Sequence, residues 1–236
     1  MERNELLYTG KAKKIYATNQ ENVLLAEYLD QATALNGLKK DKVEGKGRLN
    51  NQITGRIFEY LAEKGIGNHY LKETSKTEQL IKRVEMISLE VVVRNVSAGS
   101  FSKRFGVEEG TDLPFPVLEF YYKKDKLDDP FMNDEHIFVL GIATKEEILE
   151  IKKQTIEINT VLVEMFKKIG IRLIDFKVEF GKTADGEMIL ADEISPDTCR
   201  LWDSTTSDHL DKDIYRRDLG NIIPVYQEVL ERLNNM

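Results

Sequence analysis

Residues 174–194 read IDFKVEFGKTADGEMILADEI, which has the pattern of two strands joined by a tight turn. Its first seven residues alternate between apolar and polar types, so one strand face is apolar and the other carries Asp175, Lys177 and Glu179. Residues 188–194 form a second strand-like segment. We therefore predict a β-hairpin with one core face and one polar face.

The turn between the two segments sets which residues face each other. Asp185-Gly186 is typical of a two-residue type I′ turn, which would place Glu179 directly opposite Asp192. Like charges opposite each other destabilise a sheet. The pair therefore indicates a hard cation held by oxygen ligands, Mg²⁺ if a phosphate supplies the rest. The alternative is a solvent-exposed hairpin whose charges bind nothing.

Size and composition exclude several classes of protein. The chain has 236 residues, 41% hydrophobic and 32% charged, which is enough for a sizeable core. Its net charge of −7 and the absence of a basic stripe argue against nucleic-acid binding. We expect no membrane span, no leader segment and a cytoplasmic protein. A single cysteine, Cys199, excludes an internal disulfide, and the three scattered histidines make zinc improbable.

The remaining periodicity predicts an α+β protein of two lobes, residues 1–85 and 86–236, with antiparallel sheets, flanking helices and a cleft between the lobes. The longest predicted helix begins at Thr144, which has capping-box spacing, and ends at Gly170. Gly220 and Pro224 interrupt the last predicted helix. We expect Val117 to Tyr122 to be an edge strand, because prolines precede it. The predicted strands are 5–17, 23–29, 79–86, 89–93 and 117–122, and the predicted helices are 47–64, 144–170 and 214–233.

Residues 8–16, YTGKAKKIY, lie where the chain turns early in the first sheet. Gly10 lets the backbone approach a phosphate, and alternation sends Lys11 and Lys13 to one face as charges for polyphosphate oxygens. The alternative is a solvated, lysine-rich hairpin.

Two arginine-containing segments are candidates for an anion site. Residues 94–104, RNVSAGSFSKR, follow a buried valine strand, and Arg94 with the small residues after it suits a phosphate monoester. The alternative is a helix cap beside a surface arginine. Downstream of the hairpin, we expect Arg200 to reach the pocket of Asp192, Cys199 to be a small filler, and Trp202 to be core.

Together these motifs resemble the SAICAR synthetase family. The resemblance rests on motifs in family order that span nearly the whole chain: residues 8–16, residues 93–100, Asp175-Phe176-Lys177 through Gly181, residues 192–197, and Arg200-Leu201-Trp202-Asp203. Residues 31–34, QATA, depart from the Thr-Ser-Ala-Gly more often seen in related chains, which leaves the contacts to aspartate open.

The resemblance implies a kinase- and ATP-grasp-like fold and an ATP-dependent ligation of L-aspartate to carboxyaminoimidazole ribonucleotide, giving ADP and phosphate through an acyl phosphate. The cofactors it implies are ATP and Mg²⁺, and a homo-oligomer is expected, with a dimer favoured. The site residues it implies are a phosphate loop (Gly10, Lys11, Ala12, Lys13), an adenine hinge (Lys82, Val84, Met86), metal ligands (Glu179, Asp192), a ribonucleotide phosphate clamp (Arg94, Ser100, Arg200) and catalytic residues (Lys11, Lys13, Lys177, Asp175).

The physics of the reaction agrees with this set. A carboxylate must be activated by ATP before an amine can attack it, and positioned cations without a protein nucleophile suit such a phosphoryl transfer. Two alternatives stay open: a kinase or ligase for another phosphorylated acid, and a nucleotide-sensing binding module. Measuring which substrates are required for ADP release distinguishes the family's reaction from that of another kinase or ligase. Steady turnover excludes a binding module.

Overall fold

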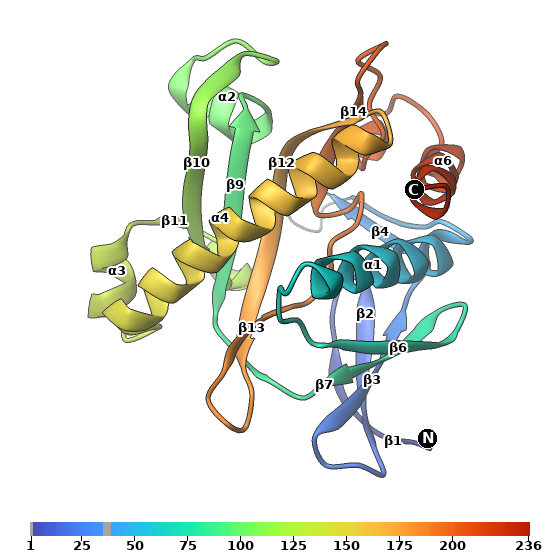
Figure 1. The fold of residues 1–236 in the computed structure, drawn as a ribbon, viewed down its shortest axis with the longest axis vertical. Coiled ribbons are helices and arrows are strands. Elements are labelled where there is room, and N and C mark those ends of the chain that lie inside the picture. The colour runs from blue at the N-terminus through green and yellow to red at the C-terminus, as the bar shows by residue number, and fades with distance from the viewer. Residues whose placement is uncertain (1, 35–38) are drawn as a thin grey trace.

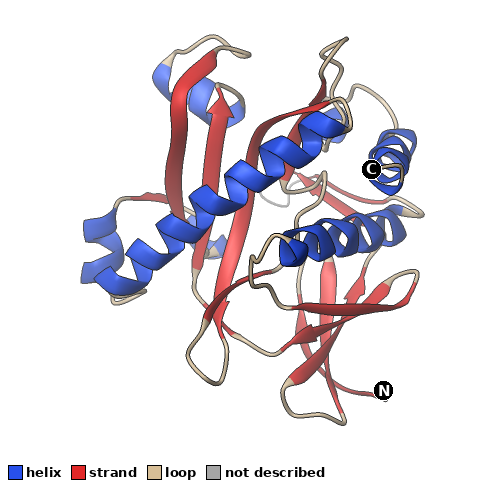
Figure 2. Cartoon of the chain, in the orientation of Figure 1, coloured by secondary structure: helices blue, strands red, loops and turns tan. Residues whose placement is uncertain are grey.

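A computed structural model describes residues 2–34 and 39–236, which form two antiparallel sheets with helices packed against them (Figures 1 and 2). The first sheet has the strand order β1-β2-β3-β7-β6. Its strands are β1 (Arg3–Thr9), β2 (Lys13–Thr18), β3 (Val23–Tyr28), β7 (Glu78–Lys82) and β6 (Tyr70–Ser75). A separate two-stranded sheet pairs β4 (Gln31–Ala34) with β5 (Lys39–Lys42).

The second sheet has seven strands and is organised around its longest one. Along the main path the order is β11-β10-β9-β12-β13, and β8 and β14 also pair with β12. The bounds are β8 (Glu85–Met86), β9 (Leu89–Val96), β10 (Asp112–Tyr122), β11 (Phe131–Met132), β12 (Ile171–Lys182), β13 (Met188–Ala191) and β14 (Cys199–Asp203). The predicted hairpin therefore lies in this sheet, with residues 174–182 in β12 and residues 188–191 in β13.

Two long helices cover the sheets. The helix α1 (Lys46–Glu63) packs on β3, β6 and β7 and on the last helix, and the left-handed Gly65 follows its end, as predicted. The helix α4 (Lys145–Lys168) crosses the second sheet diagonally and contacts β12 most (Figure 1). The predicted capping box is present, because Thr144 and Glu147 each accept the other's backbone N–H.

The remaining helices are shorter than α1 and α4. They are α2 (Gly99–Phe105), η2 (Asp125–Leu127), α3 (Asp134–Val139), α5 (Asp213–Arg216) and α6 (Ile222–Asn234). The last two correspond to the helix predicted over 214–233, which is interrupted at Gly220 as predicted. Pro224 lies in the first turn of α6, where its missing N–H costs nothing. No described helix is long and apolar enough to cross a membrane.

The hairpin at the centre of the fold differs from the prediction by one residue. Thr183 and Glu187 close the loop through the Thr183 N–H and the Glu187 carbonyl, 2.9 Å apart, so the loop has three residues rather than two. Gly186 has φ of 83°, whereas Asp185 is not among the residues with positive φ, which a type I′ turn would require. Glu179 therefore pairs with Ala191 and not with Asp192.

The predicted edge strand is also longer than expected. β10 begins at Asp112 and includes both Pro114 and Pro116. Its partner β11 pairs only with Phe120 and Tyr121, and the pairing with β9 is irregular between Asp112 and Val117. The prolines are tolerated because they lie in this irregular section.

Candidate active site

The carboxylates of Glu179 and Asp192 come together on the side of the second sheet that faces away from α4. Glu179 lies on β12, whose opposite face packs Phe176, Val178 and Phe180 into the core shared with α4. Asp192 follows β13, and its φ of 62° breaks the strand alternation. The pair is thus formed by a backbone turn and not by cross-strand register.

His69 holds the backbone of Asp192 in this conformation. Its Nε2 lies 3.1 Å from the Asp192 carbonyl oxygen, and since a carbonyl only accepts, Nε2 donates. The backbone N–H of His69 also donates to Leu190 at 2.9 Å. Burial, followed by the charge of Lys13, lowers the pKa of His69 to about 3, so the ring is neutral.

Three lysines surround the two carboxylates. Lys13 lies 2.5 Å from Asp192 and 3.3 Å from Glu193. Lys123 forms an ion pair with Glu179. Lys177 lies 2.5 Å from Glu90 and 3.7 Å from Glu179. The cluster combines opposite charges at short range in a largely buried setting.

Burial and these neighbours move the two carboxyl groups in opposite directions. Burial acts to raise the pKa of Asp192, but Lys13, Lys123 and Lys177 outweigh it, and the pKa lies well below its usual range. Burial and the charge of Asp192 raise the pKa of Glu179. The negative charge of Asp192 therefore opposes the ionisation of Glu179.

Arg94, Asp175 and Arg200 form a row across three neighbouring strands. Asp175 on β12 is directly opposite Arg94 on β9 and Arg200 on β14. An Arg94 Nη1 donates to Asp175 at 2.7 Å, and Arg200 Nη1 donates to both of its oxygens at 2.9 and 3.2 Å. The carboxylate of Asp175 fixes both guanidinium groups.

A second set of partners holds Arg94 rigidly. Its Nε donates to Glu119 at 2.9 Å and its Nη2 to the Ser100 hydroxyl at 2.9 Å. Arg104 also pairs with Glu119. Only 4% of the Arg94 side chain is exposed, so the arginine belongs to a buried network and not to the surface.

Arg200 lies directly over Gly99, at the start of α2. A Cβ added to Gly99 would be 2.4 Å from Arg200 Nη2, and Gly99 has φ of 56°. A side chain is therefore excluded here by both space and backbone conformation. Arg200 Nε donates to Asp213 at 3.0 Å, while Nη2 makes no hydrogen bond to a described residue and remains available to a ligand.

One pocket of about 460 Å³ gathers most of the predicted substrate residues. Arg94, Ser100, Asp175, Lys177 and Arg200 all line it. Asp192 does not, so the expectation that Arg200 reaches the pocket of Asp192 is wrong. Lys177 links the two places, because it lines the pocket and also contacts Glu179.

The residues of the predicted phosphate loop join β1 to β2. Gly10, Lys11 and Ala12 form the turn, and the Gly10 N–H donates to the Lys13 carbonyl at 2.8 Å. The two lysines do not converge as expected: Lys13 points to Asp192, whereas Lys11 pairs with Asp125 of η2 at 2.7 Å. A two-residue alternation does not persist through a turn.

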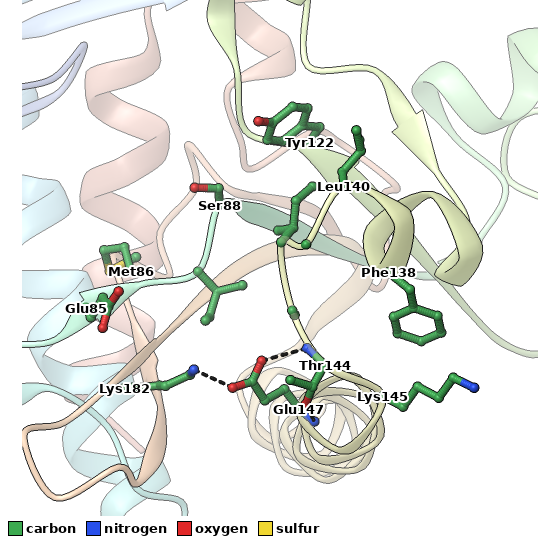
Figure 3. A pocket seen from close by; sticks show the side chains of 14 residues that line it. Glu85, Met86, Ser88, Tyr122, Phe138, Leu140, Thr144, Lys145, Glu147 and Lys182 are labelled. Atoms are coloured by element: carbon green, nitrogen blue, oxygen red, sulfur yellow. Dashed lines mark hydrogen bonds and ion pairs between the residues drawn. The ribbon is translucent and has the colours of Figure 1, made fainter.

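The predicted hinge joins the two sheets. Lys82 ends β7, Met86 lies on β8 opposite Gly181 of β12, and Val84 packs where a Gly181 side chain would be. Met86 also lines another pocket of about 720 Å³, beside the start of α4, together with Lys182 and Glu147 (Figure 3). No residue of the phosphate loop or the carboxylate pair lines that pocket.

Sequence reasoning missed several residues that complete the site. Alternation along β10 places Glu119 and Tyr121 on one face, which could have identified Glu119 as a partner of Arg94. Nothing local in the sequence indicates Lys123, Glu90 or the fully buried Lys46, because their partners are distant in the chain. Cys199 is buried and Trp202 is 9% exposed, as predicted.

Comparison with known proteins places this fold and site. The family model described as SAICAR synthetase matches residues 6–233. The phosphoribosylaminoimidazole-succinocarboxamide synthase of Enterococcus faecalis is 62% identical over 99% of this chain and 98% of its own length, and that of Streptococcus thermophilus is 59% identical over 99% of each.

Solved structures agree with the sequence matches. The phosphoribosylaminoimidazole-succinocarboxamide synthase of Ehrlichia chaffeensis superposes with a TM-score of 0.95 and 45% identity, covering 98% of this chain and 99% of that one. A SAICAR synthetase solved in complex with ADP gives a TM-score of 0.94 and 45% identity over 98% of each chain.

The fold and its relatives define an ATP-dependent carbon–nitrogen ligase of purine biosynthesis with an α+β architecture. Within that class, the chain belongs to the SAICAR synthetase family. The family's reaction is the joining of L-aspartate to carboxyaminoimidazole ribonucleotide at the expense of ATP.

Proposed function

We propose that Glu179 and Asp192 hold Mg²⁺ against the phosphates of ATP during this ligation. The observation that carries the proposal is that Lys177 and Lys123 hold the buried Glu179 and Lys13 holds the partly exposed Asp192, while the charge of Asp192 raises the pKa of Glu179. The donor set fits the ion, because carboxylate oxygens are the ligands that Mg²⁺ prefers. Asp192 Oδ2 makes no hydrogen bond to a described residue and can serve as a ligand. When bound, Mg²⁺ neutralises charge on the phosphates.

Lys13 supplies the protein cation that contacts Asp192 directly. Its side chain is only 12% exposed, and its ammonium is held by Asp192 and Glu193. We assign Gly10, Lys11, Ala12 and Lys13 to the phosphates of ATP and the backbone of Lys82, Val84 and Met86 to adenine. Nucleotide would then lie between the lobes 1–85 and 86–236.

The ribonucleotide phosphate fits the row formed by Arg94 and Arg200. Asp175 and Glu119 hold the guanidinium groups in place, so little side-chain entropy is lost on binding. Arg200 Nη2 and the Ser100 hydroxyl are the groups available to the phosphate oxygens. Lys177, between this row and Glu179, would then lie beside the reacting carboxylate of the ribonucleotide.

The chemistry needs no protein nucleophile. Cys199 is buried, and burial raises the pKa of its thiol, so the thiolate is not available. The substrate carboxylate therefore attacks the γ-phosphorus, and Lys13 and Lys177 offset the repulsion between the two anions. The aspartate amine then displaces phosphate from the acyl phosphate.

A coupled assay of ADP release tests this assignment. We expect ADP only when carboxyaminoimidazole ribonucleotide, L-aspartate and ATP are all present with Mg²⁺. ADP release with the ribonucleotide and no aspartate, at the full rate, would indicate a kinase. Nucleotide binding without turnover would indicate a binding module.

A further inference from the structure

The pocket that holds the arginine row extends to two cations that the roles above do not use. Lys212 precedes α5 and Arg216 ends it, and both line the pocket of about 460 Å³ beside Arg200. Neither lysine of the phosphate loop lines this pocket. An anion bound by Lys212 is therefore distinct from the phosphates of ATP as we place them.

The charge of Lys212 is only partly balanced. Its carboxylate partner among the described residues is Asp197, at 3.3 Å. Asp197 is closer to Lys46, at 2.6 Å, and also accepts a hydrogen bond of 2.6 Å from the Tyr226 hydroxyl. Lys46 is fully buried at the start of α1, so it cannot contact a ligand, and its ion-pair partner among the described residues is Asp197.

Neighbouring charges leave this wall of the pocket positive. Asp213 is shared by Arg200, Arg216 and Arg217, at 3.0, 2.6 and 3.3 Å. Burial lowers the pKa of Lys212, Asp197 acts to raise it, and the charges of Lys46 and Arg216 lower it further. An anion placed beside Lys212 would relieve this imbalance.

Two of the other cations of the pocket are already held by two carboxylates each. Arg94 is held by Glu119 and Asp175, and Lys177 by Glu90 and Glu179. Lys212 is 12% exposed in its side chain, enough for contact with a ligand and little enough to exclude bulk water. A charge-assisted bond to an anion is strong in such a position.

We propose that Lys212, with Arg216, binds a carboxylate of the amino-acid substrate, and that Lys46 keeps Lys212 available by neutralising Asp197. The proposal rests on the function proposed above, in which the ribonucleotide phosphate occupies Arg94 and Arg200. The remaining anionic substrate is a dicarboxylic amino acid, whose second carboxylate is what distinguishes it from a neutral amino acid. Lys212 would then select for aspartate.

Steady-state kinetics of Lys212→Gln test this assignment. A charge-assisted bond of roughly 1.5–3 kcal/mol corresponds to a rise of about 10- to 100-fold in the KM for aspartate. The KM values for ribonucleotide and ATP should change less than about threefold, and Lys212→Arg should recover most of the aspartate affinity. Asp197 keeps Lys46 and Tyr226 in this variant, which favours a folded protein.

Arg217→Gln is the matched control. It removes one positive charge next to α5, but Arg217 does not line the pocket and pairs with Glu109 at the surface, and its contact with Asp213 is the longest of the three that this carboxylate makes. We expect its KM for aspartate to stay within about twofold of the wild type. An unchanged KM for aspartate in Lys212→Gln overturns the proposal, as does an equal rise in the KM for ribonucleotide.

A footprinting measurement on the unmodified enzyme does not depend on the folding of a variant. Succinate has both carboxylates of aspartate and no amine, so it can bind without turnover. With ribonucleotide present, succinate should protect Lys212 from acetylation, read by mass spectrometry, while the exposed Lys103 stays reactive. Equal labelling of Lys212 with and without succinate contradicts the proposal. Absence of wild-type turnover would instead show that the proposed function itself is wrong.

Discussion

Asp192 reaches Glu179 through a single left-handed residue. The cross-strand partner of Glu179 is Ala191, so regular alternation would send the side chain of Asp192 to the opposite face of the sheet. The φ of 62° at Asp192 breaks this alternation and turns its carboxylate towards the face that carries Glu179. Non-glycine residues adopt this conformation at a cost, and such strain persists where the surroundings fix it. His69 and Lys13 are the contacts that fix it, through the carbonyl and the carboxylate of Asp192.

Gly99→Ala should damage ribonucleotide binding through Arg200. The new Cβ would lie 2.4 Å from Arg200 Nη2, so the guanidinium must move away from Asp175 and from the bound phosphate. We expect the KM for ribonucleotide to rise by at least about tenfold. Gly106→Ala, at the other end of α2, is the matched control. It also has positive φ, at 66°, but nothing lies within 4 Å of its Cβ, so only strain is added. Similar kinetics for the two variants would contradict the steric explanation.

Arg94→Ala should lower stability as well as ribonucleotide affinity. The change leaves Glu119 and Asp175 buried with less compensation, a defect that typically costs about 3–5 kcal/mol. Urea denaturation measures this loss in the free energy of unfolding. Arg172→Ala removes a surface partner of Asp112 and should cost less than about 1 kcal/mol. A loss of stability as small in Arg94→Ala would show that the network is not energetically significant.

Asp213 should stabilise the protein in a pH-dependent way. Burial opposes its ionisation, but Arg200 and Arg216 outweigh this and lower its pKa to about 2 from 3.8. A carboxylate with a lowered pKa stabilises the fold above the unfolded-state pKa and loses that effect as pH falls from about 4 towards 2. The shift corresponds to about 2 kcal/mol. Asp213→Asn should therefore be less stable than wild type at pH 7, and the difference in urea midpoints should shrink near pH 2. A constant difference would show that ionisation of Asp213 contributes nothing.

An isotope experiment tests the order of bond formation. If the ribonucleotide carboxylate attacks the γ-phosphorus, one of its oxygens leaves in inorganic phosphate when aspartate forms the amide. With ¹⁸O in that carboxylate, mass spectrometry should find one labelled oxygen in each phosphate released. Unlabelled phosphate alongside normal product formation would exclude an acyl phosphate.

The sequence was sufficient for the long helices and for the polar face of β12, but not for the order of elements. Residues 5–17, predicted as one strand, form β1 and β2 with a turn between them, residues 79–86 divide into β7 and β8, and β4, β5, β6, β11, β14 and α3 were not predicted. Periodicity identified α1 and α4, and the capping box at Thr144 and the glycines at 65 and 170 bound them correctly, because helix signals are local. Alternation along residues 174–180 identified the polar face of β12. All of these features are determined by residues that are close together in the sequence.

Other features depend on contacts between distant residues, and local patterns could not predict them. The one-residue error at the hairpin came from assigning Asp185-Gly186 to a type I′ turn, when Gly186 alone has positive φ. The burial of Arg94 follows from Glu119, 25 residues later in the chain. Glu90, the nearest partner of Lys177, and Lys46, the nearest partner of Asp197, are also far away in the sequence. The lobe boundary, the dimer and the cytoplasmic location remain predictions. Residues 35–38, directly after the QATA stretch, lie outside the described residues.

Binding of Mn²⁺ in the presence of ADP, measured by electron paramagnetic resonance, tests most directly whether Glu179 and Asp192 share one cation. Mn²⁺ takes the same oxygen ligands as Mg²⁺ and reports its bound fraction. We predict that Glu179→Gln and Asp192→Asn each weaken the nucleotide-dependent site by at least about tenfold. Glu187→Gln, an exposed residue of the same hairpin, should bind Mn²⁺ as the wild type does. Wild-type Mn²⁺ affinity in both Glu179→Gln and Asp192→Asn would show that these carboxylates do not share a cation.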